Sequence, residues 1–373
     1  MNMKLFKICV GELITAQSCS FHYGYGLSNF LDISSTEKNI VFFTWDYPGP
    51  EIDFTILPPN ERMFSLVEPI KKKVLAHQDQ HFWIFHPWIN FESYFNNQLP
   101  NLTITNYADE IWTQGDRARY TSIGHQIDKN FNSDKHWISL GNNRRVARYL
   151  AAMYLLGMGV ASKGLLKIDP TEILENDSWE SYLSYWRFNH RSEIFTIESS
   201  FPILKNGFYK IKNKVDYEAR IYQGVPLVNH ENFDKFLRTI YRDSFVEIVN
   251  ETMFMEPVGV ISEKILNSIY GCNLPIILGV HNTVKRLRDI GFDMFDDVID
   301  HSYDTIADPL PRMVMALDSN KRLLQDGEFA KDMWIKCKHR LENNVMLAKQ
   351  KELEFPSVVT NLLTSLNSTF KQI

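Results

Sequence analysis

The sequence has few cysteines, and none is placed for disulfide or metal chemistry. Only four cysteines occur in 373 residues, and their spacing matches neither a disulfide framework nor a zinc-binding motif. We therefore expect free, buried thiols in a reducing compartment. The four are Cys9, Cys19, Cys272 and Cys337.

Excess charge and long apolar runs are also missing. The formal net charge is only -5, which excludes the overall basic character of most nucleic-acid-binding proteins but allows a local basic groove. The longest helical apolar stretch, residues 149–161, is shorter than the ~20 residues that cross a bilayer and is interrupted by glycine. Lys4 and Lys7 precede a short apolar run, but Glu12 interrupts it and no small-residue cleavage site follows. These patterns predict a cytoplasmic protein with no membrane partner.

Strand-like and helix-like patterns alternate along the chain. The clearest strand-like runs of the N-terminal half are residues 39–45 and 81–86, with a helical pattern at 65–76 between them. A second series begins near His136 and returns after residue 234. Alternation of this kind predicts an α/β fold with parallel sheets.

The length of the chain predicts more than one domain, because a single core rarely organises 373 residues. We expect an N-terminal α/β domain over residues 1–135 and a second over 136–345. The strongly helical end of the chain predicts a C-terminal helical tail over 346–373.

Three arginines begin the helix that follows the predicted strand at 137–140. Arg144, Arg145 and Arg148 lie where a helix presents free N–H groups and the positive end of its dipole. One interpretation is a solvated basic helix start. Arginine there opposes the macrodipole, however, and a bound anion would explain that cost, so we favour a phosphate site built by guanidinium groups.

Charged residues also follow two apolar runs of the C-terminal half. Asn250-Glu251 ends the run at 246–249, and Ser262-Glu263-Lys264 opens a helical pattern that leads to the strand-like residues 275–279. In an open α/β sheet, ligands bind at the carboxyl ends of the strands. Ser262 is also a good N-cap with Glu263 in the first turn. Spacing alone leaves capping and ligand binding equally supported.

As an ordered set, these residues resemble the nucleotide-sugar domain of the α1,3-fucosyltransferases and the related exostosin-like glycosyltransferases. That domain has a glutamate at a strand end, a short loop, a Ser/Thr-Glu-Lys helix start and an apolar strand from proline to glycine. The chain is also similar to uncharacterised viral and bacterial glycosyltransferase-like proteins. That similarity spans roughly residues 136–345 and includes Asn143-Arg144-Arg145, the segment 287–292 and the segment 300–304.

The resemblance implies a GT-B-like architecture, in which two Rossmann-like domains face a cleft, and transfer of a sugar from a nucleoside diphosphate sugar to a hydroxyl acceptor. Glu263 and Lys264 would hold the ribose and phosphates of the donor, Arg145 or Arg148 the diphosphate, and Glu251 the sugar side. Val260-Ile261 replaces the aromatic residue that precedes the triplet in fucosyltransferases, so the resemblance does not assign fucose. If the chain is viral, the expected compartment is the host cytoplasm.

The chain contains no Asp-x-Asp triplet, which metal-using glycosyltransferases commonly employ to hold the diphosphate. We therefore expect a metal-independent enzyme with no cofactor besides the donor substrate, and we separately expect inversion. Inversion requires a general base that reaches the acceptor hydroxyl. Glu92 and His86 are the preferred candidates, followed by Asp46 and His22, although an ordinary loop role is the alternative for each of them.

The acceptor stays open among a glycan, a protein and a hydroxylated DNA base, which would have to leave the base stack. A basic patch would favour DNA, and its candidate residues are Lys71, Lys72, Lys73, Arg117, Arg119 and Lys129. Asp300, Tyr303 and Asp304 either contact the donor or cap the helix that begins at 308–309, and we favour capping. A catalytically silent nucleotide- or glycan-binding protein on the same fold is the alternative function.

Overall fold

The computed structural model describes residues 19–24, 28–44, 59–86, 88–95, 99–106, 129–141, 146–190, 202–215, 218–219, 240–251, 253–254 and 258–370. These residues form two compact units. The first unit comprises the described residues up to Asn106 together with the end of the last helix from Ala348, and the second runs from Lys129 to Leu347.

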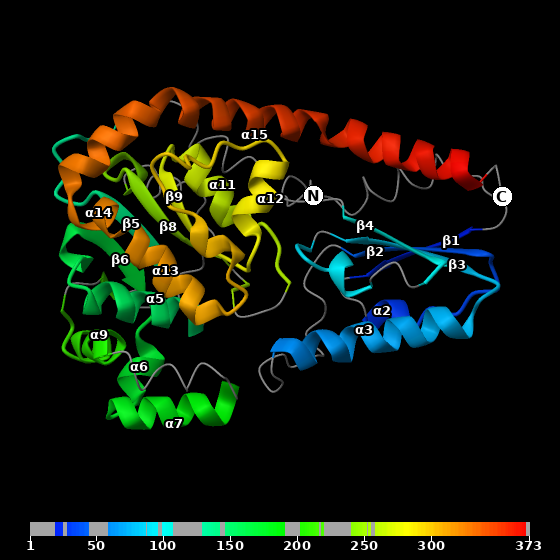
Figure 1. Cartoon of the computed structure of the whole chain (residues 1–373), viewed down its shortest axis with the longest axis horizontal. Helices are drawn as coiled ribbons and strands as arrows, with labels where there is room; N and C mark the ends of the chain where they lie inside the picture. Colours follow the sequence, from blue (N-terminus) through cyan, green and yellow to red (C-terminus); the bar gives the residue numbers. More distant parts are fainter. Residues whose placement is uncertain are drawn as a thin grey trace. The chain divides into compact units, whose positions relative to one another are not determined.

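A four-stranded parallel sheet forms the centre of the first unit (Figure 1). Its strand order follows the sequence: β1 (Cys19–Gly24), β2 (Asn39–Thr44), β3 (His81–His86) and β4 (Leu102–Asn106). Helices α2 (Ser28–Leu31) and α3 (Pro59–Ala76) lie on the same face of this sheet. Phe30 of α2 packs its ring edge-on against Phe42 and Phe82, at centroid distances of 5.6 and 5.7 Å. Aromatic side chains thus hold the helical layer to the sheet.

The second unit contains a five-stranded parallel sheet with the order β7-β6-β5-β8-β9. Its strands are β5 (Trp137–Gly141), β6 (Gly164–Ile168), β7 (Glu218–Ala219), β8 (Val246–Asn250) and β9 (Leu274–Leu278). All residues of β8 and β9 are buried, as expected for parallel strands covered on both faces. The chain builds the sheet outward from β5 to β7 and then restarts with β8 on the other side of β5. This reversal makes the β5/β8 boundary a topological switch point.

Helices cover both faces of this sheet (Figure 1). Three helices, α11 (Glu263–Tyr270), α12 (Thr283–Asp289) and the first part of α15 (Gly327–Phe370), lie on one face. On the other face, α5 (Val146–Gly157) packs on α9 (Pro202–Lys212) and α13 (Pro309–Ser319). The remaining described helices are α6 (Thr171–Glu175), α7 (Trp179–His190), α14 (Lys321–Gln325) and the short η1 (Glu92–Tyr94), η3 (Ala161–Lys163) and η4 (Ser302–Thr305).

Two glycines allow the close approach of α5 and α9. A Cβ on Gly207 would lie 1.8 Å from the Met153 carbonyl oxygen, and one on Gly157 would lie 2.0 Å from the Ile203 oxygen. Neither position accepts a side chain without moving a helix.

The structure confirms the α/β class with parallel sheets, and the predicted strands at 39–45, 81–86, 137–140, 246–249 and 275–279 correspond to β2, β3, β5, β8 and β9. Four strands were not predicted: β1, β4, β6 and β7. The predicted helical tail is the end of one longer helix, α15, which begins at Gly327 and ends at Phe370. The predicted domain boundaries and the facing arrangement of the two domains stay predictions. Among the described helices, none is long and apolar enough to cross a membrane.

Candidate functional site

The candidate site lies at the carboxyl ends of β5 and β8, at the topological switch point. Gly141 ends β5 and Asn250 ends β8, so both strands deliver the chain to the same edge of the sheet. Arg148, in the first turn of α5, is buried and returns to this edge, since a Cβ on Gly141 would lie 3.6 Å from its own Cβ. Burial excludes the interpretation of Arg148 as part of a solvated basic helix start.

Asn250 joins the two strands and presents a polar atom at their boundary. Its side-chain Nδ2 donates to Ser139 Oγ at 2.8 Å and to the Ile248 carbonyl at 3.3 Å. Within the part of the chain that the structure describes, the buried Oδ1 of Asn250 accepts no hydrogen bond. Buried acceptors are nearly always satisfied in folded proteins. This oxygen is therefore suited to an N–H or O–H donor of a ligand.

Glu251 connects the end of β8 to the start of α11. Its backbone N–H donates to the Leu278 carbonyl at 3.0 Å, which prolongs the β8/β9 pairing beyond the strands. Its buried carboxylate accepts the Ser262 N–H at 3.1 Å. Ser262, in extended conformation, then caps α11 by accepting the Lys264 N–H at 3.3 Å. These bonds place the first turn of α11 directly beside the end of β8.

The two carboxylates at this edge have pKa values shifted in opposite directions. Burial raises the pKa of Glu251, and the Lys264 charge and the Ser262 hydrogen bond only partly oppose it. Burial acts in the same direction on Glu263, but the charges of Lys264 and Arg148 outweigh it and lower the Glu263 pKa. Lys264 Nζ lies 2.8 Å from Glu263 Oε1. Divergent neighbouring pKa values are typical of ligand-binding and catalytic sites.

The structure thus brings together six of the eight predicted donor-binding residues. We call this set the β8–α11 site; it consists of Arg148, Asn250, Glu251, Ser262, Glu263 and Lys264. The other two, Arg144 and Arg145, lie outside the described residues. Two cations, a helix N-terminus and a partly exposed carboxylate can bind phosphate groups and sugar hydroxyls.

Sequence reasoning missed the residue that holds the loops behind this site. Arg312, buried on α13, donates to the carbonyls of Gly279 (2.9 Å), Phe254 (2.6 Å), Ile306 (2.7 Å) and Ala307 (2.8 Å). Its guanidinium also lies over the Phe254 ring. The segments that follow β8 and β9 are therefore fixed to one another. The only sequence signal is an arginine among the buried apolar positions of α13.

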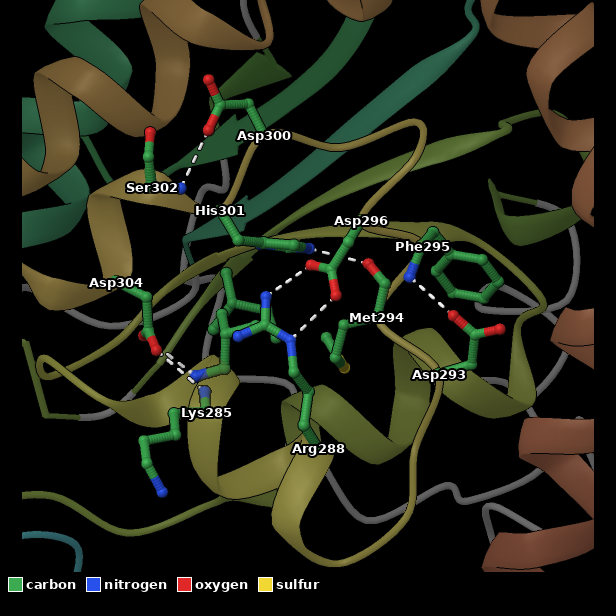
Figure 2. Close-up of polar contacts among 12 residues, drawn as sticks. Lys285, Arg288, Asp293, Met294, Phe295, Asp296, Asp300, His301, Ser302 and Asp304 are labelled. Carbon is green, nitrogen blue, oxygen red and sulfur yellow. Dashed lines mark hydrogen bonds and ion pairs between the residues drawn. The ribbon is translucent and has the colours of Figure 1, made fainter.

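Asp304 is a structural residue, although not through the cap that was expected. Its two carboxylate oxygens accept the N–H groups of Val284 and Lys285, at 2.9 and 2.8 Å, at the start of α12 (Figure 2). The predicted cap on the helix beginning at 308–309 is wrong in this detail, because Asp308 caps α13 itself through the Leu310 N–H. Asp304 therefore stabilises the start of α12. Asn282, the residue directly before this helix, has a left-handed backbone conformation.

Tyr303 and His301 form a buried network along β9. The Tyr303 hydroxyl accepts the Ile277 N–H at 3.1 Å. His301 Nε2 lies 2.7 Å from the Met294 carbonyl (Figure 2). A carbonyl only accepts, so Nε2 carries the proton and Nδ1 accepts from the Tyr303 hydroxyl at 3.1 Å. Burial lowers the His301 pKa, consistent with this neutral ring. These groups are occupied by structural bonds.

An open hollow of about 480 Å³ lies beside this network but has the wrong charge for a diphosphate. Arg288 is its one basic lining residue, and Asp296 pairs with that guanidinium (Figure 2). Hydrogen bonds from the Ser302 side chain and from its backbone N–H lower the pKa of Asp300. The hollow is lined by Arg288, Asp296, Asp297, Val298, Ile299, Asp300, His301 and Ser302. Its carboxylates would repel phosphate.

Two of the predicted general bases come together in the first unit. His86 ends β3 and is fully buried, whereas the side chain of Glu92, at the start of η1, is 51% exposed. Their Nε2 and Oε1 atoms are 3.6 Å apart. Asp46 lies outside the described residues, as do Arg117 and Arg119.

Two of the lysines named for a basic patch, Lys73 and Lys129, are bound to oxygen atoms of the fold. Lys129 is buried and donates to the carbonyls of Tyr241, Ser244 and Gly271 and to Asn273 Oδ1. Lys73 donates to three carbonyls at the end of α2, at 2.6 to 2.8 Å. Lys73 and Lys129 therefore do not contribute to a basic patch that would favour DNA. Both ammonium groups serve the fold.

Comparison with known proteins does not place the chain in a family. No protein-family model and no curated protein matches it. A search of solved structures found the α,α-trehalose 6-phosphate synthase of Burkholderia multivorans, with a TM-score of 0.39 and 11% identity over 96% of this chain and 74% of that chain. A similarity of this size assigns neither family nor function, so the resemblance to fucosyltransferase and exostosin-like proteins stays a prediction.

Proposed function

We propose that the chain is a glycosyltransferase that moves a sugar from a nucleoside diphosphate sugar to a hydroxyl acceptor, without a metal and with inversion. The observation that carries this proposal is the β8–α11 site. It combines two cations, a capped helix N-terminus and an unsatisfied buried acceptor at the switch point of a parallel sheet.

The residues of the site match the charge changes of the reaction. The acceptor oxygen attacks the anomeric carbon, the bond from that carbon to the diphosphate oxygen breaks, and a base removes the hydroxyl proton. Negative charge grows on the departing diphosphate, where Lys264, Arg148 and the first N–H groups of α11 would stabilise it. These groups would supply the positive charge that a metal supplies in other enzymes.

Carboxylates and amides serve the hydroxyl groups of the donor. Glu263 stays ionised because its pKa is lowered, so it can accept hydrogen bonds from the ribose hydroxyls. Asn250 Oδ1 would accept from a further donor group deeper in the site. Glu251 would line the sugar side, with a carboxylate fixed by the Ser262 N–H.

Calorimetric binding of nucleoside diphosphates and nucleotide sugars to the full chain tests the donor site. We expect binding to weaken strongly in Lys264→Ala and in Glu263→Ala. Lys285→Ala is the matched control, because Lys285 is an exposed lysine of α12 whose ammonium pairs with Asp289. Unchanged binding in both site variants would show that the β8–α11 site is not the donor site.

Transfer assays separate an enzyme from a silent binding protein. The full chain is incubated with the donor that binds and with glycan, protein or hydroxymethylated DNA acceptors, in the presence of a chelator. We expect transfer, with an anomeric configuration in the product that is opposite to that of the donor. Donor binding without transfer or hydrolysis would support the silent binding protein.

A further inference from the structure

We propose that Asn250 is the specificity-determining residue of the β8–α11 site, where its side-chain oxygen binds one hydroxyl group of the ligand. That hydroxyl belongs to the transferred sugar or to the ribose of the donor. This role rests on the proposed function, because it names the group of the donor that the site selects. All the residues involved lie in the second unit.

Hydrogen bonding fixes the orientation of the Asn250 amide. One terminal atom of its side chain lies 3.3 Å from the Ile248 carbonyl oxygen and 2.8 Å from Ser139 Oγ. A carbonyl oxygen only accepts hydrogen bonds, so this atom is the amide nitrogen, Nδ2. The other terminal atom is therefore the oxygen, Oδ1. The two bonds hold the side chain in place before a ligand binds.

The Asn250 oxygen is buried and needs a hydrogen-bond donor. Only 5% of Asn250 is exposed, and none of the described residues donates to Oδ1. A buried acceptor without a donor costs free energy, and a ligand that supplies the donor recovers it on binding. Because the amide is already fixed, the ligand pays little further cost to order it.

Strand register places this oxygen on the face of the sheet that α5 covers. Ser139 of β5 pairs with Ile248 of β8. Gly141 and Asn250 each lie two residues further along these strands. Side chains alternate along a strand, so Ser139, Gly141 and Asn250 share one face. Gly141 has no side chain to fill this face, and a Cβ there would lie 3.6 Å from the Cβ of Arg148 on α5.

Arg148 connects this position to the first turn of α11. Burial alone would raise the pKa of Glu263, but the charges of Lys264 and Arg148 lower it. The Arg148 guanidinium therefore extends from α5 towards α11. Asn250 also directly precedes Glu251, whose carboxylate is bonded at the same helix start. The amide oxygen thus lies at the deep end of the β8–α11 site, behind the partly exposed Glu263 and Lys264.

A hydroxyl group is the donor that fits this position. The diphosphate of a nucleotide sugar carries no proton at neutral pH, so it cannot donate to Asn250 Oδ1. An ammonium group would be repelled by the charge of Arg148. Hydroxyl groups are uncharged donors, and a nucleoside diphosphate sugar carries them on its sugar and on its ribose.

Calorimetric titration of the full chain with deoxy analogues tests this role. The probes are nucleoside diphosphate sugars of uridine, guanosine, adenosine and thymidine, the free diphosphates, and analogues that lack one hydroxyl of the sugar or of the ribose. Removal of the selected hydroxyl should weaken binding to the natural chain about 10- to 100-fold. Asn250→Leu should bind the complete ligand and that analogue with equal, weak affinity, because the acceptor is gone.

The ratio of these two affinities is the measured quantity, because a general disturbance of the site weakens both ligands alike. Asn250→Asp keeps an acceptor oxygen and should keep the preference for the complete ligand. Ser139→Ala removes one bond that orients the amide and should reduce the preference. Asn343→Leu is the matched control at an exposed asparagine of α15, and it should bind both ligands as the natural chain does.

The outcomes separate this role from the proposed function. Loss of discrimination among sugar analogues assigns the hydroxyl to the transferred sugar, and loss among ribose analogues assigns it to the ribose. If binding depends on Lys264 but Asn250→Leu discriminates every hydroxyl as the natural chain does, the role is wrong while the donor site stands. If Asn250→Leu does not fold, unchanged discrimination in Ser139→Ala overturns the role instead. If the natural chain binds none of the probes, the proposed function fails, and this role with it.

Discussion

Replacing Ser262 and Lys264 separately distinguishes a helix cap from a phosphate site at the start of α11. Ser262 Oγ accepts the Lys264 N–H at 3.3 Å, so Ser262→Ala removes the N-cap. Loss of an N-cap costs about 1 kcal/mol of stability. For a domain of about 150–250 residues, this corresponds to a decrease in Tm of about 2–4 °C. The variant keeps both charged side chains, so we expect nucleotide binding to change little.

Lys264→Ala should have the opposite profile. The Lys264–Glu263 pair measures 2.8 Å, but its side chains are 22% and 38% exposed. Solvent-exposed pairs contribute only about 0–1 kcal/mol to stability, so we expect a small change in Tm. In contrast, a unit charge about 4 Å from a phosphate oxygen at an effective dielectric constant of about 20 gains about 4 kcal/mol. Desolvation and side-chain ordering offset part of this, which leaves an expected 10- to 100-fold weakening, or about 1.4–2.8 kcal/mol.

Thermal unfolding and calorimetric titration of the same three proteins give both quantities. We expect Ser262→Ala to lower the Tm with little change in nucleoside diphosphate affinity, and Lys264→Ala to lower that affinity with little change in Tm. A loss of stability in both variants with unchanged affinity would show that the segment only starts a helix. A loss of affinity in Ser262→Ala as large as that in Lys264→Ala would show that the cap itself organises the ligand.

Three further predictions concern the scaffold. Burial raises the pKa of Glu247 from its ordinary value of 4.5 to about 8. The stability contributed by its protonated form is therefore complete below pH 4.5 and is lost as the pH rises towards 8. Glu247→Gln has no carboxyl group to ionise, so denaturant titrations should show its stability increasing relative to the natural chain over this pH range. Gly207→Ala should cost about 3 kcal/mol or more, because its Cβ would lie 1.8 Å from the Met153 oxygen. Asp304→Ala should lose about 1–2 kcal/mol from the uncapped α12 and leave nucleotide affinity unchanged in calorimetry.

Exposed residues of the second unit provide matched controls for these three variants. Glu175→Gln should show no gain with pH, Lys205→Ala should leave the α5–α9 packing intact, and Asp332→Ala should keep the Tm of the natural chain. A pH-independent Glu247→Gln difference would contradict the burial argument. A Gly207→Ala variant as stable as the natural chain would contradict the close approach of α5 and α9. A loss of nucleotide affinity in Asp304→Ala would show that Asp304 contributes to ligand binding.

The sequence predicts the elements whose pattern is strong and local. The runs that became β2, β3, β5, β8 and β9 are dense in β-branched, aromatic and other apolar residues. Two of the four strands that were not predicted have weaker patterns: β7 has only two residues, and β1 contains serine, histidine and glycine. Such strands owe their conformation to pairing with a neighbour, which is a long-range effect that local propensity does not contain.

The candidate site shows the same division between local and long-range information. Ser262, Glu263 and Lys264 are adjacent in sequence, and their cap geometry followed from residue type. Arg312 could not be predicted, because its four carbonyl partners lie on segments from Phe254 to Ala307. The burial of Lys129 was missed for the same reason, since its acceptors are more than 100 residues away.

Capping and ligand binding were competing interpretations of the Ser262 triplet, and the structure shows which atoms make the cap. The Ser262 hydroxyl takes one N–H of the first turn, and the Glu251 carboxylate takes the Ser262 N–H itself. The cap therefore uses the Ser262 hydroxyl and one oxygen of Glu251. The Lys264 ammonium also donates to the Ser262 hydroxyl, at 3.3 Å, and pairs with Glu263 at 2.8 Å, so the cap and the charged pair share one atom. Because the cap fixes the backbone from which those two side chains project, it would also support the proposed phosphate binding at this position. A cap of this kind lowers the entropy cost of ordering the two side chains around a donor.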